Sequence, residues 1–127
     1  MLPEENIPPS NKVVLQKEIV YHGYTKAGSL ADWQENVARF VAGNSRLILA
    51  SCTAFASPLI KHISGESGGF HLFGETSIGK STTILVASSI WGKASDYYKN
   101  WNTTANALEI TASQHNDALL CLDELGQ

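Results

Sequence analysis

One short segment constrains this chain more than any other, because its glycines and its lysine have the spacing of a phosphate-binding loop. Residues 74–81 read GETSIGKS and match the pattern G-x-x-x-x-G-K-[ST] in full. An apolar run at 70–73 leads into the segment, and an apolar helical pattern follows it. Strand, loop and helix in this order are the context in which the motif binds phosphate, so the sequence predicts a nucleotide site here.

Each part of this loop has a physical task. Glycines at its two ends permit backbone geometries and a close approach to an anion that a side chain would block. The loop amides and the N-terminus of the following helix attract phosphate oxygens. We expect the Lys80 ammonium to reach the β- and γ-phosphates and the Ser81 hydroxyl to bind magnesium (Mg2+). The predicted nucleotide-binding residues are Gly74, Glu75, Thr76, Ser77, Ile78, Gly79, Lys80, Ser81 and Thr82.

Two adjacent acids follow a second apolar run. Residues 119–122 are apolar, and Asp123 and Glu124 come directly after them. Such a run is typical of a buried parallel strand, and parallel sheets place ligands at the carboxyl ends of their strands. Solvated acids at a strand end are the alternative, but the spacing from Lys80 suits a nucleotide-hydrolysing core. We therefore predict that Asp123 holds Mg2+ and that Glu124 polarises the attacking water, with Lys80 as the second catalytic residue.

The fold class follows from the alternation of strand-like and helical patterns after residue 65. It predicts an α/β fold, a partial P-loop NTPase with a RecA- or AAA-like parallel sheet and flanking helices, over residues 66–127. Strands are expected at 70–73, 97–101 and 118–122, and helices at 80–91 and 105–115.

The preceding residues, 12–65, predict a mostly helical portion. Short strands are expected within 13–24, and an amphipathic helix capped by Ser29 or Asp32 is expected to end at Gly43 and Asn44. A second helix over 46–63, capped by Ser45, is apolar nearly all round and is expected to be buried, with Pro58 bending or splitting it. Residues 1–11 are rich in proline and predict a flexible lead.

Composition excludes several classes of protein. A chain of 127 residues with 43% hydrophobic content can bury a core without a metal or disulfide staple. A net charge of -3 argues against a wholly basic nucleic-acid module but leaves room for a local basic groove. Cys52 and Cys121 lie in apolar runs and predict buried free thiols. Polar residues interrupt the apolar stretch at 47–63, so we expect a soluble, cytoplasmic protein with no membrane partner.

Beyond these motifs, several further segments carry a family resemblance. They are Gly28–Leu30, Trp33–Val37, Gly43–Leu47, Gly68–Leu72, Ser89–Gly92, Trp101–Glu109, His115–Asp117 and Leu122–Gln127. Together with the loop they resemble the family described as domain of unknown function 927, found with primase- and helicase-like proteins of phages and integrated elements. Glu75 and Thr76 stand where the family often has small hydroxyl residues. The resemblance covers nearly the whole chain and implies a helicase-like ATPase of DNA replication or mobile-element maintenance.

The adjacent acids Asp123 and Glu124 also imply a longer parent protein. In the class with adjacent acids, a strand with a sensor residue and an arginine finger follow in the sequence, so we expect this chain to be an N-terminal fragment that ends just after the acids. The parent is expected to bind ATP and Mg2+, hydrolyse ATP, contact DNA and form a homo-oligomer. Two alternatives stay open: a nucleotide-dependent switch or remodelling module that does not act on DNA, and an inactive truncated fragment.

Overall fold

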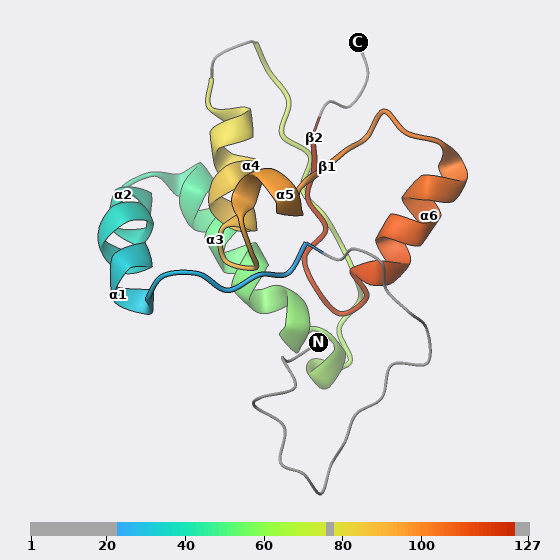
Figure 1. The fold of residues 1–127 in the computed structure, drawn as a ribbon, viewed down its shortest axis with the longest axis horizontal. Helices are drawn as coiled ribbons and strands as arrows, with labels where there is room; N and C mark the ends of the chain where they lie inside the picture. The colour runs from blue at the N-terminus through green and yellow to red at the C-terminus, as the bar shows by residue number, and fades with distance from the viewer. Residues whose placement is uncertain (1–22, 76–77, 124–127) are drawn as a thin grey trace, which may run out of the picture.

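The computed structural model describes residues 23–75 and 78–123. Helices make up most of this part, and a small sheet lies between them (Figure 1). The flexible lead predicted at 1–11, all but two residues of the range 13–24 in which short strands are predicted, and the site residues Thr76, Ser77 and Glu124 lie outside the described residues. Gly23 and Tyr24, the described end of that range, form no strand. Within the described ranges, no helix combines the length and the apolar character needed to cross a membrane.

The first helical stretch begins as the sequence predicts. Helix α1 (Leu30–Trp33) continues through a π-helical segment, η2 (Gln34–Ala38), into α2 (Arg39–Val41). Ser29 and Asp32 form a capping box, because each side chain accepts a hydrogen bond from the backbone N–H of the other. Gly43 takes a φ of 81° just after α2. The next helix is capped by Asn44, whose Oδ1 accepts from Leu47 N at 3.3 Å, and the prediction of Ser45 as its cap was wrong.

The second predicted helix is shorter and more exposed than expected. Helix α3 (Ser45–Ala56) ends where Pro58 cannot continue it, and the short 3-10 turns η3 (Ser57–Leu59) and η4 (Lys61–Ile63) follow. The prediction of burial all round was wrong, because Ile48 is 43% exposed and Phe55 is 55% exposed. Only the stripe with Ser51 and Ala54 is buried, since α4 covers one side of α3 and α2 adds only a smaller contact.

That neighbour is α4 (Lys80–Ser88), the helix that follows the predicted phosphate loop. The Arg46 side chain reaches the loop residue Ile78 near the start of both helices, and Trp91 Nε1 donates to Ala54 O at 3.2 Å near the end of both. These two contacts show that α3 and α4 run side by side in the same direction. The main core lies against this pair; its buried members are Ala54, Ala87, Tyr97 and Cys121.

The remaining elements are α5 (Ala94–Tyr97), β1 (Lys99–Asn100), α6 (Ala105–Gln114) and β2 (Leu122–Asp123). The helix predicted at 105–115 is confirmed, and the Thr104 hydroxyl caps it through Ala107 N at 3.3 Å. Strands β1 and β2 are parallel. Their register places Lys99 opposite Leu122 and Asn100 opposite Asp123.

The predicted fold class was wrong. Within residues 23–75 and 78–123 the structure is mostly helical, and its sheet has only β1 and β2, so the RecA- or AAA-like parallel sheet of a P-loop NTPase is not present there. Residues 70–73, predicted to be the strand before the loop, form no ladder, and Phe70 and Phe73 are 65% and 84% exposed. In Figure 1 this segment rises past the sheet.

The strand predicted at 118–122 forms only at its end, and the reason lies in the facing chain. Extending the observed register backward would place residue 120 opposite Tyr97, but Tyr97 is the last residue of α5 and so cannot act as a strand partner. A strand needs a facing strand to satisfy its backbone groups. The paired residues therefore begin at Leu122. Before it, residues 118–120 are half-buried, and Cys121 is buried with its carbonyl oxygen accepting from Lys99 N at 2.9 Å.

Candidate phosphate-binding site

The loop before α4 has the backbone geometry that its glycines permit. Gly74 takes a φ of 142° and Gly79 a φ of 87°, both in the range that other residues avoid. A Cβ added at Gly74 would lie 2.4 Å from Ile78 Cδ1, so the loop closes tightly on itself there. A Cβ added at Gly79 would meet no atom within 4 Å. Glycine is therefore favoured at this position by its positive φ and not by lack of space.

The N-terminus of α4 has no side-chain cap. Its N-cap residue is Gly79, which has no side chain to accept a hydrogen bond. The first N–H bonded within the helix is that of Thr83, which donates to Gly79 O at 3.0 Å. The N–H groups of the preceding residues 80–82 therefore lack a helical acceptor, and the positive end of the helix dipole lies at the same place. By contrast α1, α3 and α6 are capped by Ser29, Asn44 and Thr104.

Lys80 folds across the loop. Its ammonium donates to Gly74 O and to Glu75 O, each at 2.7 Å. Both ends of the loop are thus tied together by one cation. An ammonium has three N–H donors, so two of them hold the loop and the third can point at a ligand.

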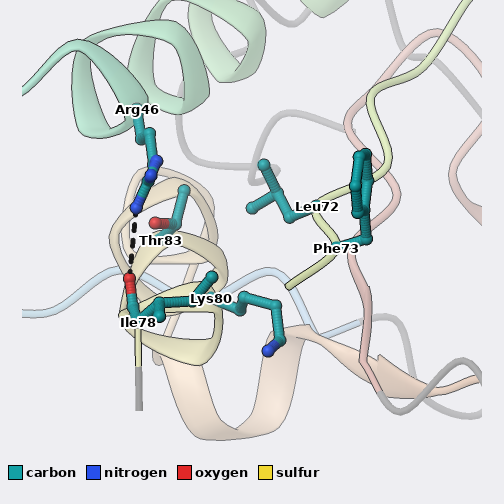
Figure 2. Close-up of a pocket in the computed structure, with 6 residues that line it drawn as sticks. All are labelled: Arg46, Leu72, Phe73, Ile78, Lys80 and Thr83. Atoms are coloured by element: carbon teal, nitrogen blue, oxygen red, sulfur yellow. Dashed lines mark hydrogen bonds between the residues drawn. The ribbon is translucent and has the colours of Figure 1, made fainter. Parts of the chain in front are cut away.

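A hollow lies between this loop and α3 (Figure 2). It is lined by Arg46, Leu72, Phe73, Ile78, Lys80 and Thr83. Two of these side chains are cations and none is an acid. Arg46 Nη1 donates to Ile78 O at 3.4 Å, and this contact bridges α3 and the loop. With Arg46 engaged by Ile78 O, the two cations give the surroundings of the loop a positive charge that favours an anion at the start of α4.

The comparison with known families agrees with the resemblance seen in the sequence. The description "Domain of unknown function (DUF927)" matches residues 1–127. The chain belongs to the DUF927 family. Neither a curated protein nor a solved structure matches it. Because the family description assigns no activity, the function of this DUF927 chain has to be argued from its site.

The predicted magnesium ligands lie on neighbouring elements. Ser81 is exposed in the first turn of α4, and Asp123 is half-buried at the end of β2. Strand β2 contacts α4, so the two elements that carry these oxygens are packed together. Asp123 O also accepts from Trp101 N at 2.8 Å, which fixes the backbone of the acid within the sheet. Within the described residues, no group of three or more His, Cys, Asp or Glu side chains forms a further metal centre.

The cysteines and tryptophans divide between core and surface. Cys121 is a buried free thiol as predicted, and burial raises its pKa, so it stays protonated and serves packing. Cys52 is exposed, and its predicted burial was wrong because it lies on the uncovered side of α3. Trp33 Nε1 donates to Ser89 Oγ at 3.0 Å, a part-buried contact that agrees with a packing role. Trp101 is 40% exposed.

Sequence reasoning missed Arg46 as a site residue. It stands in the segment Gly43–Leu47, which contributed to the family resemblance, but no motif relates that segment to the loop. The two are more than 30 residues apart in the sequence and meet only because α3 packs on α4. A lone arginine in the first turn of a helix carries no signal of this kind by itself.

Proposed function

We propose that this DUF927 chain binds the phosphates of a magnesium nucleotide, ATP above all, at residues 74–82. The observation that carries the proposal is the combination at the start of α4: an uncapped helix N-terminus with Lys80 closed over its own loop. A helix end without a cap leaves N–H groups in need of an acceptor, and phosphate oxygens supply several. The full match of the loop to its motif supports the same ligand.

The metal is the second part of the proposal. Ser81 would hold Mg2+ with its hydroxyl, and Asp123 would hold it directly or through water. The contact between β2 and α4 supports Ser81 and Asp123 as joint ligands, because it keeps the strand that carries Asp123 close to the helix that starts at the phosphate loop. Hard oxygen ligands of this kind are the ones that Mg2+ prefers. Glu124, outside the described residues, keeps the proposed role of polarising the attacking water.

Titration of the purified chain with Mg-ATP tests the proposal. Lys80→Ala removes one charge-assisted contact to phosphate, for which about 1.5–3 kcal/mol is typical, so we expect the dissociation constant to rise about 10- to 150-fold. Lys26→Ala is the matched control, since Lys26 is an exposed lysine outside the hollow. Calorimetry with ATP and ADP, each with and without Mg2+, gives the affinities. Equal affinity of wild type and Lys80→Ala, or no binding by wild type, would show the proposal to be wrong.

ATP hydrolysis, action on DNA as a helicase-like protein, a homo-oligomeric assembly and a cytoplasmic location extend this proposal to a longer parent protein. They rest on the family resemblance and on the motif, and they stay predictions. Phosphate release by the parent, measured with and without DNA, tests the first two together. Release that DNA does not stimulate would count against action on DNA.

A further inference from the structure

Arg46 reaches the phosphate loop from a rigid support. It lies in the first turn of α3, whose N-terminus is capped by Asn44. The buried stripe of α3 packs on α4, and Trp91 ties the far ends of the two helices together. The backbone at Arg46 is therefore held in place relative to α4, and only the long side chain spans the gap to the loop.

The contact that Arg46 makes sets the orientation of one peptide group. Its Nη1 donates to the carbonyl oxygen of Ile78 at 3.4 Å. In a trans peptide, the carbonyl of one residue and the N–H of the next point in opposite directions. Holding the Ile78 oxygen toward α3 therefore turns the Gly79 N–H away from Arg46. Figure 2 shows the guanidinium on the α3 side of the loop, with the Lys80 side chain extending away from it.

Glycine makes this restraint necessary. Gly79 has a φ of 87°, a conformation that glycine adopts far more easily than other residues, so its backbone gives the peptide between residues 78 and 79 unusual freedom. The peptide on its other side is held by α4, because Thr83 N and Thr83 Oγ1 donate to Gly79 O at 3.0 Å and 2.9 Å. Neither loop contact of Lys80 holds this peptide, because both go to the first two loop residues, Gly74 and Glu75. Among the described residues, the Arg46 guanidinium is thus the side chain that hydrogen-bonds the peptide between residues 78 and 79.

We infer that Arg46 is a positioning residue for the phosphate loop, which it prepares for a polyphosphate by fixing the peptide between Ile78 and Gly79. The inference rests on the proposed function and names how that site is kept ready. Arg46 acts here through the loop backbone and does not itself contact phosphate. Removing it leaves the Lys80 contacts in place but lets the Gly79 N–H leave the orientation in which it serves an anion.

The test compares Arg46→Met, Arg46→Lys and a control, Arg39→Met. Methionine keeps the apolar stem and the helix propensity of the site, whereas lysine keeps a donor that can reach a carbonyl. Arg39 pairs with Glu35 on the first helical stretch and does not line the hollow. Two readouts are taken: the amide resonance of Gly79 in the nucleotide-free protein, and the dissociation constant of Mg-ATP at about 0.1 M and about 0.5 M salt.

Loss of one hydrogen bond that organises the loop predicts a dissociation constant about fivefold higher in Arg46→Met. For Arg46→Met we expect the same ratio of dissociation constants to wild type at both salt concentrations, together with a shifted Gly79 resonance. Arg46→Lys should restore the wild-type affinity and the wild-type Gly79 resonance, and Arg39→Met should change neither. An unchanged resonance and affinity in Arg46→Met, while Lys80→Ala binds weakly, would overturn the inference and leave the proposed function standing. A loss that vanishes at high salt would overturn it too, because Arg46 would then act by charge alone. Wild-type protein that ignores nucleotide would overturn both.

Discussion

The Tyr97 hydroxyl ties α5 to the segment that carries the predicted acids. Tyr97 is fully buried, and its hydroxyl donates to Leu119 O at 2.5 Å and also hydrogen-bonds the Tyr24 side chain. Its ring meets Tyr24 and His115 edge to face, with both centroid distances at 5.4 Å. Leu119 lies in the run that leads to Asp123 at the end of β2. Tyr97→Phe therefore isolates one buried hydrogen-bonding group at a position that supports the site.

The magnitude follows from what phenylalanine keeps and what it loses. The ring, its apolar area and its edge-to-face contacts remain, so the hydrophobic contribution is nearly unchanged. The carbonyl of Leu119 loses its donor, and a buried group left unsatisfied costs about 1–3 kcal/mol. Tyr24 loses a partner at the same time. We expect the free energy of unfolding to fall by about 2 kcal/mol, which lowers the urea midpoint by about 1 M for a slope of about 2 kcal/mol per M.

Urea unfolding of the purified chain, followed by circular dichroism, measures this change. Tyr98→Phe is the matched control, because Tyr98 is the next residue, is half-buried, and has no hydroxyl hydrogen bond to any described residue. We expect the control to change the free energy of unfolding by less than about 0.5 kcal/mol. If Tyr97→Phe is as stable as wild type, or if both variants lose the same amount, the hydroxyl does not hold the segment and the reasoning fails.

Two further predictions concern the same core. His115 is buried, its Nδ1 lies 2.7 Å from Thr111 O, and burial lowers its pKa. As the pH falls, His115 therefore takes up a proton in the unfolded chain before it does so in the folded protein. This contribution to the free energy of unfolding is complete above about pH 6.5 and is lost as the pH drops below it. In His115→Phe the free energy of unfolding should change less than in wild type between about pH 7.5 and about pH 5.5. An equal change with pH in wild type and variant would contradict this prediction. A Cβ at Gly92 would lie 2.3 Å from Gly23 O, so Gly92→Ala should lower the free energy of unfolding by about 1–3 kcal/mol. Gly69→Ala, with open space around it, should leave the urea midpoint unchanged.

The loop shows how far short-range reasoning reaches. Its spacing predicted the helix start at Lys80, and α4 begins there with positive φ at both loop glycines. The predicted cap at Ser29 is equally local, since its hydroxyl bonds an N–H three residues on. The predicted nucleotide and metal roles of these residues stay predictions.

The sheet shows where such reasoning stops. An apolar run before the loop and another before Asp123 look like buried strands, but whether a run becomes a strand depends on a facing strand elsewhere in the chain. The facing residue Tyr97 is helical, so pairing begins only at Leu122, and the run at 70–73 has no ladder partner within the described residues.

By itself, then, the sequence determined the start of α4 at the loop, the cap at Ser29 and most helix positions, because hydrogen bonds within a few residues and the freedom of glycine settle them. Tertiary structure alone decided which strands pair, which side of α3 stays exposed, and that Arg46 meets Ile78. Those outcomes depend on contacts between residues far apart in the chain, and such contacts form only when packed helices bring the residues together.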